Sequence, residues 1–204
     1  MTTELRPTLK GQAAIDLWLQ GRRARNQWVD QHPETHIDFS EVDFSPYRDC
    51  DSVSEYLWPF AGFVFPNGGI NFINAQFGKG NVSFMGATFK GPVFFIGTVL
   101  GGGQYNFEHT DFSDRVIFLG LENAGAVQGF SFKFASFNGP LQFSAQEPFN
   151  CVIDLIGTKI THHVSLAGLR CNMQTARSLS TEGFKWLNKT AAADKDDAER
   201  FRRL

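Results

Sequence analysis

Residues 69–95 read GINFINAQFGKGNVSFMGATFKGPVFF, and this stretch predicts the fold class. An apolar or small residue stands two positions before a Phe, and the pair then returns after five to seven residues. The pairs are Ile70/Phe72, Ala75/Phe77, Val82/Phe84, Ala87/Phe89 and Val93/Phe95. Side chains at positions i and i+2 of an extended chain point to the same side, so each pair places two side chains inward. A spacing of five fits neither the period of a helix nor that of a long strand.

Short runs rich in Gly, Asn, Lys and Pro separate the pairs, and these residues favour turns. A chain that turns a corner after every inward pair forms a solenoid, in which each coil stacks on the last at about 4.8 Å through backbone hydrogen bonds. The Phe rings then stack in columns inside. Each ring buries on the order of 150–250 Å², so the columns are expected to provide most of the stability.

The same pattern runs from Ile37 to Cys171. We therefore predict an all-β solenoid over residues 37–171, interrupted by irregular loops at 45–62 and 119–129. Residues 1–36 are predicted to form an N-terminal arm and a capping helix, and residues 172–204 a C-terminal helical cap or tail. The predicted core positions are Phe72, Phe77, Phe84, Phe89, Phe95, Phe107, Phe112, Phe118, Phe132, Phe137, Phe143, Leu155, Ile160 and Leu166.

These units resemble the pentapeptide repeat family, whose pattern is roughly Ala-(Asp/Asn)-Leu-x-x with Phe often in place of Leu. The resemblance covers residues 37–171 and rests on many units that agree in register. It implies a right-handed quadrilateral β-helix. The steps of six and seven residues are similar to those of the Phe-rich, less regular members.

The period changes to that of a helix between Gln12 and Gln31. The exposed end of a solenoid needs a cover, so we expect this helix to cap the first coil with Trp18 and Trp28. Gly21, Asn26 and Trp28 also resemble the lead-in helix of many pentapeptide repeat proteins.

Arg22, Arg23 and Arg25 fall mostly off the apolar face of this helix. We expect them to be solvated, with an anion-binding patch as the alternative.

Residues 45–62 break the repeat and carry four aromatic residues, Tyr47, Tyr56, Trp58 and Phe60, between acidic ones. One interpretation is a loop folded over the first coil with its aromatic residues buried. The other is a protruding loop that contacts a partner, because long loops on rigid scaffolds often carry binding. Both interpretations stay open, and the four aromatic residues are our candidate partner contacts.

The second irregularity, residues 119–129, places Asn123 where an inward Phe would stand. We expect a widened corner in which Asn123 forms a hydrogen bond with nearby backbone. A side loop that interrupts the wall is the alternative.

The charge of the chain excludes some partners. The net charge is −2, too small to indicate a nucleic acid or a charged membrane surface as partner.

Three cysteines at no metal-binding spacing indicate reduced thiols in a cytoplasmic protein. We also find no apolar run long enough to span a membrane and no secretion signal.

No pattern of catalytic residues stands out. His162 and His163 are neighbours, and neighbours on a strand point to opposite sides. No Ser-His-Asp or Cys-His set can be placed, and we predict a protein that is not an enzyme and that binds no metal or cofactor.

The leading function hypothesis is a rigid scaffold for an unknown protein partner, and homodimer formation is left open. One alternative follows from the family resemblance: some pentapeptide repeat proteins mimic DNA and bind type II topoisomerases. That role calls for a strongly acidic column, whereas residues 37–171 carry twelve acidic and seven basic side chains. A third hypothesis, suggested by the charged helical pattern that runs to Leu204, is the soluble part of a longer membrane-linked protein.

Overall fold

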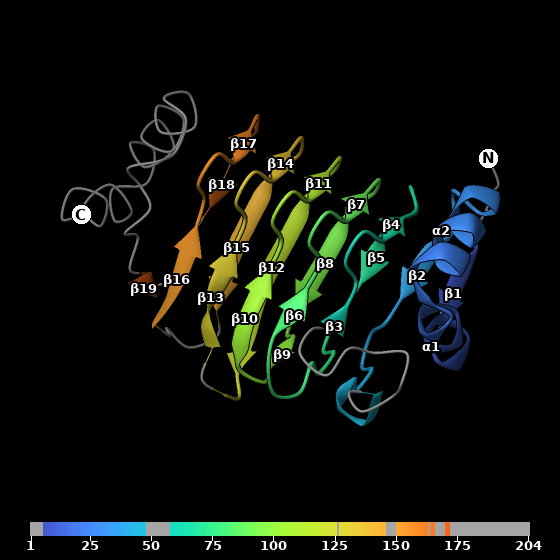
Figure 1. The fold of residues 1–204 in the computed structure, drawn as a ribbon, viewed down its shortest axis with the longest axis horizontal. Coiled ribbons are helices and arrows are strands. Elements are labelled where there is room, and N and C mark those ends of the chain that lie inside the picture. The colour runs from blue at the N-terminus through green and yellow to red at the C-terminus, as the bar shows by residue number, and fades with distance from the viewer. Residues whose placement is uncertain are drawn as a thin grey trace.

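The computed structural model describes residues 6–47, 58–125, 127–145, 150–162, 164–165 and 170–171. In this part of the chain the strands pair in parallel and stack along one long axis, with two helices at the N-terminal end (Figure 1). The fold is a β-solenoid, as predicted. The expected C-terminal helical segment, 172–204, lies outside the described residues.

The largest sheet has eight strands and runs the length of the solenoid. Its strands are β1 (Thr8–Lys10), β2 (His36–Asp38), β5 (Ile70–Asn71), β8 (Val93–Ile96), β12 (Val116–Asn123), β15 (Leu141–Ala145) and β18 (Val164–Ser165), with β9 (Val99–Leu100) paired to the end of β12. We call it the eight-stranded sheet.

Two further sheets form the other walls. The six-stranded sheet contains β3 (Trp58–Pro59), β6 (Val82–Ser83), β10 (Gly103–Asn106), β13 (Val127–Ser131), β16 (Asn150–Asp154) and β19 (Arg170–Cys171). The five-stranded sheet contains β4 (Val64–Phe65), β7 (Thr88–Phe89), β11 (Asp111–Phe112), β14 (Ser136–Phe137) and β17 (Lys159–Ile160).

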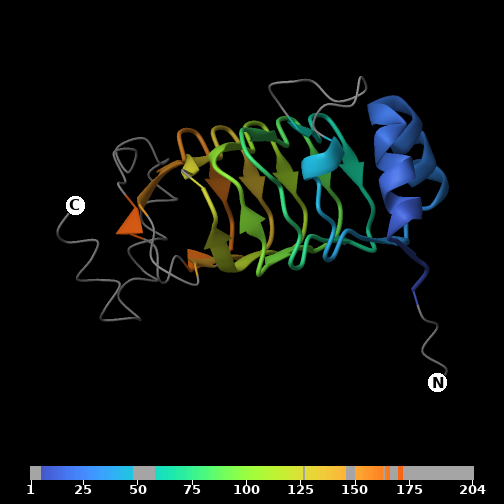
Figure 2. The same cartoon turned by 90° about the horizontal axis from the view of Figure 1, so that it is seen from below.

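A fourth line of pairings joins successive turns between the eight- and six-stranded sheets. Gln76 bridges both Asp43 and Val99, and Val99 pairs with Glu122. The spacing between turns is regular in the middle of the column, since Ile70 pairs with Val93 and Val93 pairs with Val116 at equal separations along the chain. Figure 2, which is turned by 90°, shows the coils stacked side by side along the long axis.

The interior consists of Phe ladders, as predicted. Phe84 stacks between Phe60 and Phe107 with ring centroids 4.7 and 4.8 Å away. Phe95 stacks between Phe72 and Phe118 at 4.7 Å on both sides. The predicted core positions that are buried are Phe72, Phe77, Phe84, Phe89, Phe95, Phe107, Phe112, Phe118, Phe132, Phe137, Phe143 and Leu155. Ile160 is only partly buried, and Leu166 lies outside the described residues.

The smaller inward position of each pair also forms ladders, in which Thr replaces Ala in some turns. Thr98 donates its hydroxyl proton to the carbonyl of Phe72 at 2.7 Å, and Thr110 donates to the carbonyl of Phe84 at 2.9 Å. Thr158 is fully buried in the same way. A buried hydroxyl is costly unless it is hydrogen-bonded, and the preceding coil supplies the acceptor.

Some corners between walls require glycine. A Cβ atom on Gly91 would lie 2.2 Å from the carbonyl oxygen of Asn67, one turn earlier. Gly86 has no atom within 4 Å of such a Cβ, but its φ of +65° favours glycine. Close stacking and backbone conformation therefore select glycine at different corners.

The N-terminal helical segment differs from the single helix that the sequence predicts. It forms α1 (Gln12–Leu19) and α2 (Gly21–Gln31). Gly21 has a φ of +81°, which a continuous right-handed helix does not contain, so the chain changes direction there.

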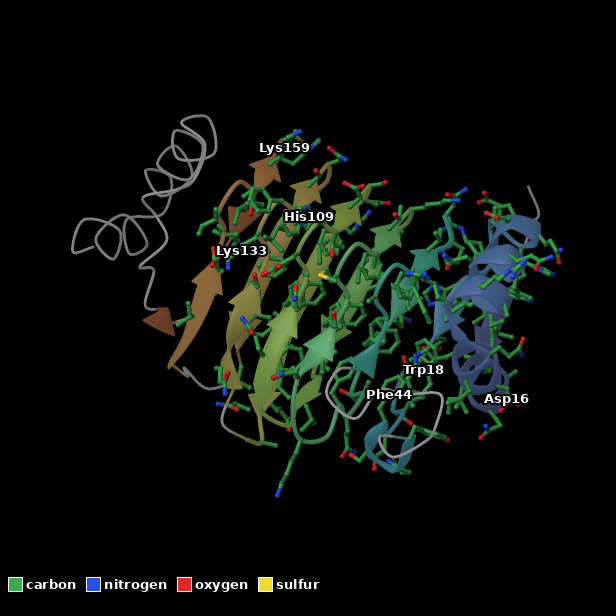
Figure 3. All side chains as sticks on the ribbon, in the orientation of Figure 1. Asp16, Trp18, Phe44, His109, Lys133 and Lys159 are labelled. Carbon is green, nitrogen blue, oxygen red and sulfur yellow. The ribbon has the colours of Figure 1, made fainter. Side chains whose placement is uncertain are left out.

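Trp18 packs on the first coil as predicted. Its ring lies 5.2 Å from that of Phe44 and 5.6 Å from that of Phe60 (Figure 3). Trp28 is only partly buried and stacks on His32 at 4.3 Å.

The expectation that Arg25 is solvated was wrong. Its side chain is 1 % exposed, lies 4.2 Å from the Phe65 ring centroid, and donates a hydrogen bond to the carbonyl of Val64 at 2.7 Å. The neighbouring Asn26 accepts from the backbone N–H of Val64 and donates to the carbonyl of Gly62. These two side chains form hydrogen bonds with the backbone around β4, the outermost strand of its sheet. The Val64 carbonyl and the Phe65 ring offset part of the cost of burying the Arg25 charge.

Candidate functional surfaces

The structure corrects the predicted partner loop. Phe60 is fully buried and stacks on Phe84 in the core, so it cannot be a partner contact. The strand pairing of Trp58 with Val82 shows why: residues 58–62 already belong to a solenoid turn. The long insertion hid this strand from the periodicity argument, and the irregular segment is shorter at its C-terminal end than predicted.

Among the other three candidates, the structure describes only the side chain of Tyr47. Tyr47 ends a short 3-10 helix, Ser45–Tyr47, and its ring contacts Trp18 edge-on at 5.9 Å. Only the backbone of Trp58 is described, and Tyr56 lies outside the described residues. Phe60 is therefore removed from the candidate partner contacts, and the prediction for Tyr56 and for the side chain of Trp58 lies outside the described part of the chain.

The predicted irregular segment 119–129 is mostly strand, since β12 extends to Asn123 and β13 begins at Val127, but Asn123 makes the expected hydrogen bond to nearby backbone. Asn123 is exposed, and its side-chain oxygen accepts a hydrogen bond from the backbone N–H of Gly125 at 3.4 Å. Leu121 is buried nearby. The strand register shifts between Phe118 and Leu121, which accommodates the additional residues without opening the wall.

The outward residues of the five-stranded sheet are mostly polar. They stack in one ladder, in which each residue pairs with the corresponding residue of the next turn: Val64, Thr88, Asp111, Ser136 and Lys159. Asp111 and Lys159 are exposed. The fourth line of pairings is similar, with exposed Asp43, Gln76 and Glu122.

The eight-stranded sheet has a different outer face. One outward ladder runs through Asn71, Phe94, Ile117 and Gln142. A second ladder runs through Ile73, Ile96 and Leu119, linked by backbone hydrogen bonds to the next corner of each turn. We call Ile73, Phe94, Ile96, Ile117 and Leu119 the apolar face patch. Leu119 is 39 % exposed and the other four are half-buried.

The sequence contains a signal for this patch that the Phe pattern obscured. Residues 93–96 read VFFI and residues 116–119 read VIFL. A run of four apolar residues in a strand places two inward and two outward, because alternate side chains point to opposite faces. The burial pattern of β8, in which Val93 and Phe95 are buried and Phe94 and Ile96 are not, follows this alternation.

A second exposed feature lies at the corner between the six- and five-stranded sheets. His109 and Phe134 stack with ring centroids 5.1 Å apart, and Phe134 is 54 % exposed. Both have positive φ, at positions where other turns have Gly62, Gly86 or Gly157. We call His109 and Phe134 the aromatic corner. An L-residue in this conformation costs about 1–2 kcal/mol. The backbone conformation therefore does not explain why His and Phe stand at these two positions.

Charged side chains flank the aromatic corner (Figure 3 labels His109 and Lys133). The Lys133 ammonium lies 3.3 Å from the Asp154 carboxylate and 3.8 Å from that of Glu108. Ser131 donates a hydrogen bond to the same Glu108 carboxylate at 2.8 Å. Since these groups satisfy one another, the cluster orders the surface and offers no obvious acid–base pair.

A hollow of about 480 Å³ lies between β1, α1 and α2. Its lining is Leu9, Ala13, Asp16, Leu17, Gln20, Ala24, Gln27, Trp28 and Gln31. Asp16 is the one ionisable group in this lining, and it accepts a hydrogen bond from Gln12 at 2.7 Å. A lone carboxylate does not make a catalytic constellation.

Within the described ranges, no three His, Cys, Asp or Glu side chains gather so that they could hold a metal ion. In the same part of the chain, no helix is long and apolar enough to cross a membrane. Comparison with protein-family models, curated proteins and solved structures finds no match to this chain.

Proposed function

We propose that this chain is a non-enzymatic scaffold for protein–protein interaction, and that the apolar face patch is its contact surface. The observation that carries the proposal is the contrast between walls. The five-stranded sheet has a mostly polar outward ladder, whereas the eight-stranded sheet presents Phe94, Ile96, Ile117 and Leu119 side by side. A contiguous exposed apolar patch is typical of an interaction site.

The energetic argument supports the same conclusion. Full burial of a Leu, Ile or Phe side chain contributes about 1.5–3 kcal/mol, so covering several half-exposed ones contributes a few kcal/mol in total. The interior does not need these side chains, because Phe95 and Phe118 already fill the space behind them. Contact with a partner is the simplest role for the outward side chains of the apolar face patch.

The pentapeptide repeat type is part of the proposal. Three sheets and a fourth line of pairings support a quadrilateral coil, and Ala and Thr two positions before Phe support the repeat pattern. The right-handed sense comes from the family resemblance. The contacts of Trp18, Arg25 and Asn26 with the first turns support a role for α1 and α2 as an N-terminal cap.

The DNA-mimic alternative has less support. It requires a continuous acidic stripe along the column. On the five-stranded sheet Asp111 lies between Thr88 and Ser136, and Lys159 follows. On the fourth line Val99 separates Gln76 from Glu122.

We keep the longer membrane-linked protein as a hypothesis without a structural argument, and we propose the cytoplasm as the location from the cysteine pattern.

Affinity capture from lysate of the source cells, read by mass spectrometry, tests the scaffold. The variants are Ile117→Lys in the patch and Thr88→Lys on the five-stranded sheet as the matched control. Substitution of Phe60 would be unsuitable because it disrupts the core. We expect proteins captured by the parent chain and by Thr88→Lys to be lost with Ile117→Lys. Identical capture by all three would refute the patch, and a topoisomerase lost only with Thr88→Lys would favour the DNA mimic.

A further inference from the structure

The apolar face patch has an internal symmetry that indicates its occupant. Along its first ladder the side chains read amide, apolar, apolar, amide: Asn71, Phe94, Ile117, Gln142. The ladder continues with Asp38 before Asn71 and Ser165 after Gln142, so the order of polar and apolar side chains from Asp38 to Ser165 is the same in both directions. A surface that reads the same in both directions can pair with a copy of itself about a two-fold axis.

We propose that the patch binds the same patch of a second copy of this chain, about a two-fold axis that is parallel to the strands and lies between β8 and β12. The inference rests on the proposed function and names the partner. This axis reverses the order of the turns, so Phe94 faces Ile117 of the second copy and Asn71 faces Gln142 of the second copy. Side-chain amides both donate and accept, so the two can pair.

The central pair of the second ladder fits the same arrangement. Ile96 and Leu119 are partners in neighbouring strands, and the axis places Ile96 over Leu119 of the second copy. Ile73 extends this ladder by one turn. On the other side the register shift after Phe118 ends the ladder. Two sheets packed in this way lie about 10 Å apart with interdigitating side chains.

The other two-fold arrangement is less favourable. An axis parallel to the solenoid axis would place each turn over the same turn of the second copy with the strands antiparallel. Asn71 would then face Ile73 of the second copy. An amide buried against an apolar side chain loses its hydrogen bonds to water without replacement, which is costly. The pairing of Asn71 with Gln142 therefore selects the axis parallel to the strands.

The size of the face predicts a weak dimer. A four-residue strand such as β8 spans about 13 Å, and the six strands from β2 to β18 span about 24 Å, so the face covers on the order of 300 Å² in projection. A standard stable interface buries about 800 Å² on each partner. We therefore expect a dissociation constant in the micromolar range or higher, and a monomer–dimer equilibrium that depends on concentration.

Sedimentation velocity of the full chain over a concentration series tests this inference. We expect the parent chain and Thr88→Lys to dimerise alike. Ile117→Lys should raise the dissociation constant by about 30-fold or more, because it places an unpaired charge in the interface.

A charge pair tests the axis and does not depend on the patch variant remaining folded. Asn71→Lys alone and Gln142→Glu alone should each weaken the dimer by about tenfold or more, because each places a charge against a neutral amide of the second copy. The doubly substituted chain, or an equimolar mixture of the two single variants, should regain dimer. Absence of recovery would overturn the proposed axis.

The failures of the two proposals can be separated. If the parent chain stays monomeric at all concentrations while Ile117→Lys still abolishes capture of another protein, the second-copy inference is wrong and the scaffold stands. If Ile117→Lys changes neither self-association nor capture, both are wrong.

Discussion

The outer faces of the eight-stranded and five-stranded sheets are built over the same interior and differ in chemistry. Beneath the first, Phe95 stacks with Phe118 at 4.7 Å, and beneath the second, Phe112 stacks with Phe137 at 4.7 Å. Outside, the first places Phe94 next to Ile117, whereas the second places Thr88 next to Asp111. The two sheets therefore share their inward Phe ladders and differ in their outward side chains.

This difference indicates that solenoid formation requires apolar inward ladders and leaves the outward residues free to vary. The five-stranded sheet stacks in register with Asp111 and Lys159 outside, so apolar residues outside are not needed for the fold. We therefore propose that the apolar residues outside the eight-stranded sheet serve binding.

The largest expected effects test whether the two interiors are equivalent. Phe95→Ala beneath the eight-stranded sheet and Phe112→Ala beneath the five-stranded sheet should each destabilise the protein by about 3–5 kcal/mol. Both rings are buried and stacked on two neighbours. Urea denaturation measures both. A cost below about 0.5 kcal/mol, which is typical of a surface substitution, would show for either variant that its ring is not part of a stacked core.

The corners next to the five-stranded sheet offer the next test. Gly91→Ala, where the chain enters the eight-stranded sheet, should cost about 2–3 kcal/mol, because the new Cβ collides with the backbone of Asn67. Gly86→Ala, on the other side of the five-stranded sheet, should cost only about 1 kcal/mol, from its positive φ alone. Thermal denaturation compares them, and the reverse order would contradict the close stacking of turns at Gly91.

The first strands of the two sheets have different contacts, and this difference affects how stability depends on pH. The eight-stranded sheet begins with β1, whereas at β4 the five-stranded sheet is contacted by the buried Arg25. Burial lowers the pKa of Arg25 to about 9, so the folded chain binds this proton less tightly than the unfolded chain does. Stability due to Arg25 must therefore rise as the pH passes above about 9.

Arg25→Met lacks this titration. Between about pH 8 and about pH 10, the parent chain should gain roughly 1–1.5 kcal/mol of stability relative to the variant. Guanidinium unfolding at both pH values measures the difference. A constant difference would mean that Arg25 does not titrate in this range.

A smaller effect is expected at the aromatic corner, which lies next to the polar sheet. Phe134→Gly relieves a positive φ but removes a ring that stacks on His109. We expect the stability to stay level or to rise by up to about 1 kcal/mol. Chemical denaturation measures this change, and a loss above about 1 kcal/mol would show that the stack is structural.

The smallest effect on stability is expected on the outer faces themselves. Ile117→Lys and Thr88→Lys should each change the free energy of unfolding by about 0.5 kcal/mol or less, since outward substitutions remove no core contact. Measurement at low protein concentration keeps self-association out of the result. A loss above about 2 kcal/mol for Ile117→Lys, comparable to the loss of a buried side chain, would indicate that the patch stabilises the monomer instead of binding a partner.

Sequence periodicity predicted the interior well, because Phe and its smaller companion two residues earlier must point to the same side of a strand. It failed for Phe60, since the insertion that precedes Trp58 hides the register. It failed for Arg25 because a charged residue on a helix is usually solvated, and only the fold reveals that the carbonyl of Val64 lies within reach.

The candidate surface was harder to predict than the fold. Phe94 and Ile117 belong to different turns and are far apart in the sequence, and only the strand register brings them side by side. The outward ladder is visible in the sequence only after the inward one is assigned, because both contain apolar residues.

Site-specific photo-crosslinking in the source cells would show which outer face of the solenoid contacts other proteins. A photoreactive amino acid replaces Ile117 on the eight-stranded sheet in one strain and Thr88 on the five-stranded sheet in another. We predict protein adducts, including one with a second copy of the chain, from position 117 and none from position 88. Equal crosslinking from both positions, or adducts from position 88 alone, would contradict the assignment of the apolar face patch as the binding surface.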